Sequence, residues 1–349
     1  MVRSTAPPGD FTWRDAGRTV VFRRGGVGAA VEILRGYGVG EFELLSTERA
    51  LSKASSLREM ANGVHMVASG QVPAAAAGLL DALAPLHDAG KGVRARPLVA
   101  LGGGRVVDVA KAIAAVSGAP VAAIPTTLSG APMTAIHRLP AGAESRARAM
   151  VRPALVIADP EAMTSQPEGE MRASAMNALA HGADTLYVPG SNPVSEMTAL
   201  RGAELIAGAV DEAREGRDRA ALSLGAILCG YAIDSAGFGL HHLVCQTLVR
   251  LCGTPHAETN AAILPHSVAF LAAQASEPYQ RLAAALGAER DGLARRIEGL
   301  GRPPRLGEVG GDPSKLNEAI EAMLQRPELQ HVPQPPDREE LSGLVAKAW

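Results

Sequence analysis

The hydrophobic period of this chain changes once, at Asp159-Pro160, and this change restricts the fold more than any other feature. Before it, apolar runs of strand length alternate with stretches whose apolar residues recur at helical spacing. After it, nearly every segment has helical spacing and ends at Gly or Pro. The first pattern predicts a parallel sheet covered by helices, and the second predicts a separate helical domain. We therefore expect an α/β domain over residues 1–160 and an all-helical domain over residues 161–349.

The same period predicts the individual elements. Strands are expected at 19–22, 42–45, 64–68, 97–101, 121–124 and within 154–160, with a helix from residue 72 to Gly90 and a hairpin-like excursion at 133–140. Helices are expected at 171–188, 193–213, 217–235, 240–252, 257–274 and 278–287. In the tail, from Arg302 to Trp349, we expect a Pro-rich surface connection before one final short helix.

Size and charge exclude several classes of protein. At 349 residues the chain is longer than the roughly 250–300 residues at which single cores stop growing, so two domains are expected. A net charge of −2 gives no electrostatic footprint for nucleic acid or for an anionic membrane. No apolar run reaches the roughly 18 residues of a membrane span, and residues 1–18 lack a signal-peptide core. Cys229, Cys245 and Cys252 lie in apolar contexts, which favours buried thiols in a reducing cytoplasm.

Three consecutive glycines, Gly102, Gly103 and Gly104, separate the apolar strand at 97–101 from a helix. Without Cβ atoms the backbone can approach a phosphate closely, and the free N–H groups and dipole of the helix favour negative charge. An ordinary tight turn is the alternative, but it needs fewer glycines. The sequence therefore predicts a phosphate-binding bend here. The glycine-rich run at 25–34 is a weaker match to a dinucleotide fingerprint, because Val31 replaces the third glycine.

A cluster of hydroxyl groups follows the next strand, with Thr126, Thr127 and Ser129 just beyond Ile124-Pro125. Parallel sheets bind their ligands at the carboxyl ends of the strands. We expect these hydroxyls to line the same ligand site as the glycines.

The helical half contains a second concentration of chemistry, in Gly239–His266. This stretch holds His241, His242, His256 and His266, which are four of the nine histidines. Gly253-Thr254-Pro255 should end one helix and start the next, which brings His242 and His256 near each other. Imidazole is both a proton donor near neutral pH and a neutral metal ligand. Structural roles are the alternative, and we favour them for His241 and His266.

Asn177 and His181 are four residues apart, so they should project from one face of one helix. With His242 and His256 they would make a pocket of three imidazoles and one amide, which leaves a position open to a catalytic metal. The amide of Asn177 is neutral and holds a divalent ion poorly. A site for Fe²⁺ or Zn²⁺ on His181, His242 and His256 is therefore possible in composition but weak in charge.

Five motifs carry a family resemblance, and they occur in collinear order: GGGxxxDxAK at 102–111, IPTT at 124–127, MNALAH at 176–181, GLHH at 239–242 and PHAETNAAILPH at 255–266. With them the chain resembles the iron-containing alcohol dehydrogenase superfamily, and within it the maleylacetate reductases, over almost its whole length. The resemblance implies an N-terminal Rossmann-like, nucleotide-binding α/β domain and a C-terminal helical domain that holds the catalytic and metal site. This is the fold shared with dehydroquinate synthase. Family members are commonly dimers, so a homodimer is expected.

The resemblance also implies site residues. Gly102, Gly103, Gly104 and Asp108 would meet the pyrophosphate of NADH or NADPH, with Thr126 and Thr127 along its path to the nicotinamide ring. His181, His242 and His256 match the metal-ligand histidines, and Asn177 matches a fourth ligand that is usually Asp. Arg105, Ala131 and Gln246 depart from the usual family residues.

We therefore expect a nicotinamide-dependent reductase of a small keto or enone carboxylate, with His242, His256 and Asn177 in catalytic roles. The departures keep two alternatives open: a biosynthetic enzyme of cyclase, lyase or dehydratase type on the same fold, and a non-catalytic homologue.

Overall fold

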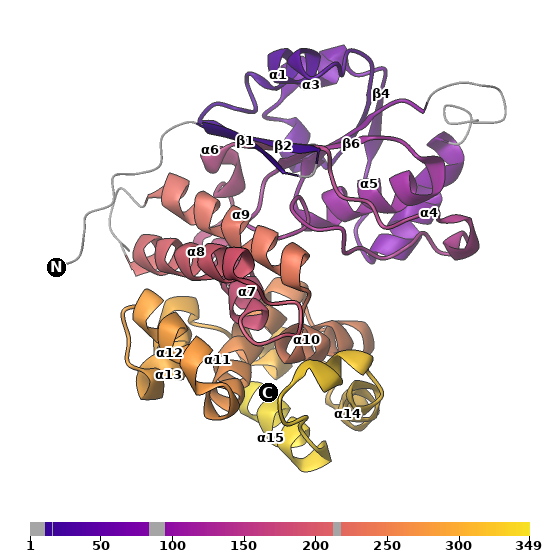
Figure 1. Cartoon of the computed structure of the whole chain (residues 1–349). Helices are drawn as coiled ribbons and strands as arrows, with labels where there is room; N and C mark the ends of the chain where they lie inside the picture. The colour runs from indigo at the N-terminus through magenta and orange to yellow at the C-terminus, as the bar shows by residue number, and fades with distance from the viewer. Residues whose placement is uncertain (1–10, 16, 84–94, 212–217) are drawn as a thin grey trace. The chain divides into compact units, whose positions relative to one another are not determined.

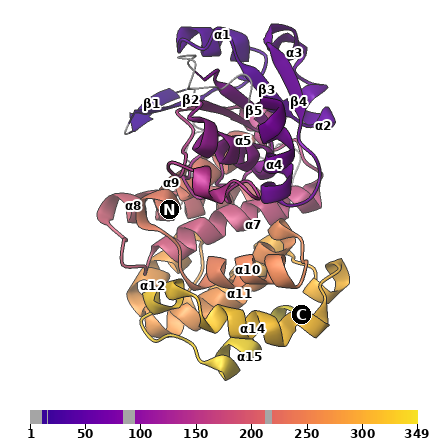
Figure 2. The same ribbon diagram turned by 90° about the vertical axis from the view of Figure 1, so that its right-hand side faces the viewer.

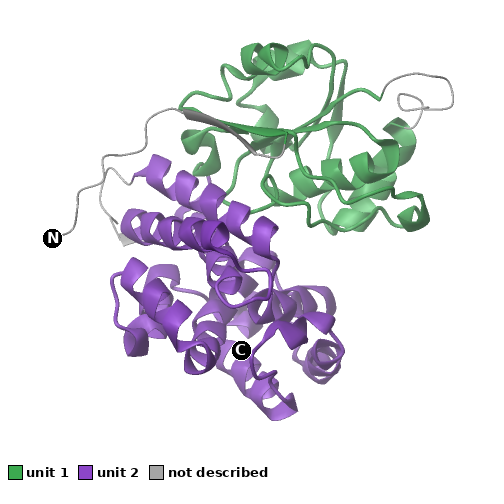
Figure 3. Ribbon diagram, viewed as in Figure 1, with its two compact units in different colours: residues 1–165 green, residues 166–349 purple. Residues whose placement is uncertain are grey.

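The computed structural model describes residues 11–15, 17–83, 95–211 and 218–349 (Figure 1). These residues form two compact units, Met1–Ser165 and Gln166–Trp349 (Figure 3). The first unit is α/β and the second is helical, so the predicted fold class is confirmed. The sequence analysis put the boundary at residue 160.

Unit 1 is built on one seven-stranded sheet in the order β1-β2-β7-β6-β5-β3-β4. The strands are β1 Phe11–Asp15, β2 Arg18–Phe22, β3 Glu43–Ser46, β4 Gly63–Met66, β5 Leu98–Gly102, β6 Val121–Pro125 and β7 Leu155–Ala158. All neighbours are parallel except β1, which pairs antiparallel with β2. The chain moves outward from β3 to β4 and then back through β5 to β6. Parallel sheets bind ligands at such a reversal, which here lies between β3 and β5.

Two helical layers cover the sheet. Helices α4 (Val72–Leu83) and α5 (Gly104–Ser117) pack on one face (Figure 2), and α1 (Ala30–Gly36), α2 (Glu48–Leu51) and α3 (Ser55–Met60) pack on the other. Because both faces are covered, the central strands are apolar throughout, and β5 and β6 are buried at every residue. A short helix, α6 (Pro160–Met163), follows β7 and is capped by Asp159.

Unit 2 is organised around α7 (Glu168–Thr185), which is buried at every residue from Met171 to Thr185. The helices α8, α9, α10, α11 and α13 all pack against it. The helices that follow α7 are α8 Pro193–Asp211, α9 Arg219–Ala236, α10 Leu240–Leu251, α11 His256–Gln274, α12 Ser276–Ala285, α13 Leu293–Gly301, α14 Leu316–Leu324 and α15 Arg338–Ala348. A helix enclosed in this way needs small residues on every side, which explains the alanines of α7.

Several predicted elements need correction. The antiparallel strand β1 was not expected. Residues 133–140 form no hairpin, because this stretch has no strand. The tail contains α14 as well as the final helix α15. Gly90, predicted to end the helix that starts at Val72, lies outside the described residues.

In the described ranges no single helix is both long and apolar enough to cross a bilayer. The pair α9 and α10 passes that test together, with a bend of 99° between its members.

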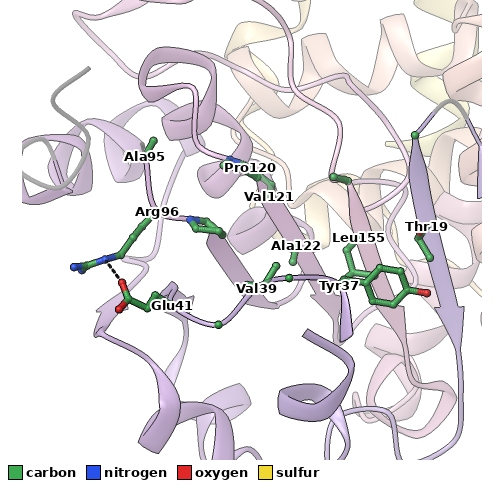
Figure 4. Close-up of a pocket in the computed structure, with 15 residues that line it drawn as sticks. Thr19, Tyr37, Val39, Glu41, Ala95, Arg96, Pro120, Val121, Ala122 and Leu155 are labelled. Atoms are coloured by element: carbon green, nitrogen blue, oxygen red, sulfur yellow. Dashed lines mark ion pairs between the residues drawn. The ribbon is translucent and has the colours of Figure 1, made fainter. Parts of the chain in front are cut away.

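A hollow of about 500 Å³ lies at the amino ends of the parallel strands (Figure 4). Its lining includes Thr19, Tyr37 and Leu155, and on one side Arg96 pairs with Glu41 at 3.5 Å. The glycine bend follows the carboxyl end of β5 and so belongs to the opposite edge of the sheet. This hollow is therefore separate from the predicted ligand site.

Candidate functional site

The glycine bend lies where β5 ends and α5 begins, as predicted. Gly102 is the last residue of β5, and Gly103 is the N-cap of α5 with extended backbone (φ −72°, ψ 180°) and no side-chain cap. The first N–H groups of α5 are therefore left for a ligand or for water. Side chains would fill this space, because a Cβ on Gly103 would lie 3.0 Å from Thr127 Cγ2 and one on Gly104 would lie 2.7 Å from Ser129 Oγ. The bend is a cradle that only glycine leaves open.

The hydroxyl groups of the turn after β6 face this bend. The backbone N–H of Thr126 donates to the Gly102 carbonyl at 2.9 Å, which joins the two turns. The hydroxyl oxygens of Thr127 and Ser129 are buried, yet neither has a hydrogen-bond partner among the described residues. Buried hydroxyls are normally paired, so these two point to a missing ligand or water. Together with the open glycines, they fit the phosphates of a nucleotide.

Charged side chains of the first two turns of α5 lie nearby. The Oδ1 atom of Asp108 lies 2.8 Å from Lys111 Nζ. Asp108 is the residue predicted to meet the pyrophosphate, and one of its two carboxylate oxygens is therefore already paired. The side chain of Arg105 is exposed in the first turn and makes no hydrogen bond or ion pair with another described residue. A cation is unfavourable at a helix N-terminus unless an anion compensates it. The position of Arg105 therefore favours an anionic ligand at the bend.

In unit 2, α7 carries Asn177 and His181 one turn apart, and both are buried, with exposed fractions of 3% and 8%. His181 stacks on His242 of α10, with ring centroids 4.8 Å apart and planes 13° from parallel. The structure thus brings together residues 181 and 242 from two helices, which the sequence analysis predicted.

Asp184 organises this cluster and was missed by the sequence analysis. It is fully buried, and its Oδ2 accepts a hydrogen bond from His242 Nδ1 at 2.8 Å. The same carboxylate accepts the backbone N–H groups of Gly239, His241 and His242 at the start of α10, and the hydroxyl of Tyr187 at 2.9 Å. It therefore caps α10 and fixes the imidazole of His242 at once. Its spacing of three residues from His181 was the available signal.

Gly239 is required at this helix start. A Cβ there would lie 2.0 Å from the hydroxyl of Tyr187, whose oxygen also accepts the N–H of Leu240. The glycine of the GLHH motif therefore allows the close approach of α7 and α10.

Three polar atoms of the cluster have no hydrogen-bond partner in the part of the chain that the structure describes. They are His242 Nε2, His181 Nδ1 and Asn177 Oδ1, and each is buried. Because Asp184 accepts from Nδ1 of His242, the opposite nitrogen of that ring is directed away from the carboxylate and is free to exchange a proton. Unpaired buried polar atoms are costly, and such a group in one place indicates a ligand-binding site.

The remaining histidines of the stretch have different surroundings. His256 is the first residue of α11, just after the predicted helix break, and it is exposed. His241 is buried between Ser267 and Asn260, with ring-nitrogen distances of 3.0 Å to each. The Nδ2 of Asn260 donates to the His256 carbonyl at 2.7 Å, so His241 helps to position the start of α11.

Burial decides the charge states. Burial lowers the pKa of His181 well below its ordinary value, and the nearby charges of His242 and His256 lower it further. Burial also lowers the pKa of His241 to about 3, so both rings are neutral. For Asp184, burial alone would raise the pKa, but the hydrogen bond and the charge of His242 bring it well below its usual range. The Asp184 carboxylate therefore keeps its negative charge at neutral pH.

The metal role predicted for His181, His242 and His256 has no support in this arrangement. Within the described ranges no three His, Cys, Asp or Glu side chains are grouped to hold an ion. The planes of the His181 and His242 rings are 13° from parallel, with their centroids 4.8 Å apart. Asn177 adds no charge. The metal role of these residues therefore stays a prediction, and we derive no step through an ion.

Comparison with known proteins identifies the family. Residues 18–160 match the model of the iron-containing alcohol dehydrogenases, and residues 171–349 match the C-terminal model of the same family. The chain belongs to the iron-containing alcohol dehydrogenase family. It is an NAD(P)H-dependent oxidoreductase.

Similar proteins support this assignment along the whole length. The maleylacetate reductase of Rhizobium sp. (strain MTP-10005) is 30% identical over 97% of both chains. The crystal structure of maleylacetate reductase from Agrobacterium tumefaciens has a TM-score of 0.82 at 29% identity and covers 98% of both chains. An iron-containing alcohol dehydrogenase from Corynebacterium glutamicum has a TM-score of 0.81 at 30% identity, covering 99% of this chain and 97% of that one. The predicted resemblance to maleylacetate reductases is confirmed.

Proposed function

We propose that this oxidoreductase uses NADH or NADPH to reduce a keto or enone carbon of a small carboxylate. Its relatives include maleylacetate reductases, whose name gives a small carboxylate as the substrate. The observation that carries the proposal is the Asp184–His242 pair. One imidazole nitrogen is held by a buried carboxylate, and the other is buried without a partner. This is the arrangement of a positioned proton donor.

We assign the nucleotide to the glycine bend. The backbone of Gly102, Gly103 and Gly104 and the free N–H groups of α5 would hold its pyrophosphate, and the hydroxyls of Thr126, Thr127 and Ser129 would line its path. When bound, the reduced nicotinamide supplies the hydride. Arg105 adds a positive charge beside the phosphates. Asp108 lies near the bend, and its Oδ1 is already paired with the Lys111 ammonium.

In unit 2, His242 holds the transferable proton at Nε2 and gives it to the substrate oxygen that becomes the hydroxyl or enol. Asp184 keeps Nδ1–H in place throughout and balances the positive charge that the ring carries while protonated. Asn177, one turn before His181, has a buried amide oxygen without a hydrogen-bond partner among the described residues, and this oxygen would accept a hydrogen bond from a donor group of the substrate. His256, at the surface, is the second candidate proton donor. A homodimer, expected from the family resemblance, and a cytoplasmic location, expected from the cysteines, remain predictions.

The test is consumption of reduced cofactor, followed by absorbance, with maleylacetate and a series of other small keto acids. We expect turnover of at least one of them. The H242Q variant should lose kcat by about 10²–10⁴-fold, the usual contribution of a positioned proton donor. As a matched control, H65Q in unit 1 should leave kcat unchanged.

Two results would contradict the proposal. Turnover by H242Q within about twofold of the wild type would remove His242 as proton donor. Tight nucleotide binding without turnover of any keto acid would favour the biosynthetic alternative on the same fold.

A further inference from the structure

Lys111 holds a segment of chain that has no regular structure of its own. Residues 131–136 follow the hydroxyl-rich turn after β6 and form neither helix nor strand. The Lys111 ammonium donates to the carbonyls of Ala131 and Ile136 at 3.1 and 2.8 Å and lies 3.5 Å from Thr134 Oγ1. One side chain of α5 therefore contacts both ends and the middle of this segment.

Stability of α5 alone does not account for this lysine. Its side chain is fully buried, and its charge is balanced by Asp108 at 2.8 Å. Burying an ammonium group is costly, and a lysine that only paired with an acid one turn away could do so in solvent, as Lys315 does with Glu318 at 2.9 Å. The buried position is needed for the three oxygens of the segment.

The segment in turn forms one wall of the glycine bend. A Cβ on Gly104 would lie 3.7 Å from the Cβ of Ala131, which is adjacent to the close contact with Ser129. A second buried cation, Arg18, donates from Nη1 to the Met133 carbonyl at 2.6 Å. Because α5 begins at the bend and carries Lys111 two turns later, the lysine fixes the distance between the bend and its opposite wall.

We infer that Lys111 is a positioning residue for the nucleotide: it holds the 131–136 wall against the glycine bend and keeps the charge of Asp108 away from the phosphates. This inference rests on the nucleotide site of the proposed function. It assigns a role to a residue that touches neither nucleotide nor substrate.

The test separates the two effects of the lysine. In the variant K111M/D108N both charges are absent, so no unpaired carboxylate is left beside the bend. We expect NADH to bind at least about tenfold more weakly by calorimetry, which corresponds to the loss of about one charge-assisted hydrogen bond. The KM for NADH should rise by a similar factor, and kcat at saturating cofactor should fall by less than the affinity does. In the absence of nucleotide, amide hydrogen exchange at residues 130–136 should be faster in this variant than in the wild type. The K315M variant, which breaks an equivalent surface pair, is the control for all three.

Nucleotide affinity and exchange equal to the wild type in K111M/D108N would overturn the inference, and would show that Lys111 serves only to neutralise Asp108. If that variant does not fold, K111L/D108N, which likewise has no hydrogen-bond donor at residue 111, is judged by the same criteria. Failure of the wild type to bind either nucleotide would instead overturn the proposed function, and this inference with it.

Discussion

A single methyl group at Gly104 is expected to close the phosphate cradle. Its Cβ would lie 2.7 Å from Ser129 Oγ and 3.0 Å from Ser129 Cβ, so the wall of the bend has to move outward. G104A should therefore weaken NADH binding by about tenfold or more while the protein stays folded. Calorimetric titration with NADH measures this. In the control, G208A, the added Cβ meets nothing within 4 Å. Unchanged affinity in G104A would place the nucleotide elsewhere.

Asp184 is expected to affect kcat through His242, the proposed proton donor, which it holds in place. In D184N the amide has one oxygen for five donors, and it cannot balance a positive charge on His242. We expect kcat to fall by about 10²-fold or more, with a smaller change in the KM for cofactor. Asp218 also caps a helix, through the N–H groups of Ala220 and Ala221, but contacts no histidine. D218N should therefore keep its kcat, and a similar loss in both variants would mean that capping alone is affected.

The break between helices α10 and α11 determines where α11 begins, and His256 is the first residue of α11. Gly253 has φ +72°, which is a left-handed conformation that ends α10, and Pro255 is the N-cap of α11. G253A should destabilise the protein by about 1 kcal/mol or more, because alanine tolerates this conformation poorly. Urea unfolding measures the loss. Gly299, inside α13 and without a contact at its Cβ position, is the comparison site. G299A should be neutral or stabilising, and equal effects in the two variants would contradict the argument.

The Lys111 side chain is the corresponding feature of unit 1, because it joins the helix after the bend to the irregular segment opposite. Irregular backbone near a ligand needs anchors, since it has no ladder of its own hydrogen bonds. Two buried cations, Lys111 and Arg18, supply them here.

For the molecule as a whole, the buried histidines predict an unfolding free energy that falls in acid. Burial lowers the pKa values of His181, His241 and His137 below the ordinary value of 6.5, and that of His241 to about 3. Below about pH 6.5 the unfolded chain therefore binds more protons than the native one, and stability decreases as pH falls, by up to about 1.4 kcal/mol per pH unit for each histidine that stays neutral in the folded protein.

Asp184 has the opposite chemistry but acts in the same direction. Its native pKa is depressed, so its stabilising contribution is complete above the ordinary value of 3.8 and is lost below it. Urea unfolding at about pH 7.5 and about pH 5.5 tests the histidine contribution, and H241Q should show a smaller difference between the two. Equal midpoints for the wild type at both values would mean that these rings are protonated in the folded protein.

The two-unit architecture could be predicted from the residues alone, because a change of hydrophobic period is a local property that each segment carries in its own residues. The glycine bend and the helix break were predictable for the same reason: glycine and proline restrict the backbone where they stand. The proximity of His181 and His242 could be predicted from the motifs MNALAH and GLHH. Strand β1 was missed because an edge strand is defined mainly by its partner, β2.

The contacts of each polar side chain depend on tertiary packing and could not be predicted from the sequence. Asp184 lies on α7 but binds the start of α10, and it is 58 residues from His242 in the sequence. No local pattern marks that contact. Lys111 could equally have been a surface lysine, and His256 a buried one. Burial and hydrogen-bond partners come from how distant segments pack, so the histidine–carboxylate pair and the anchored wall of the glycine bend could be found only after the chain was folded.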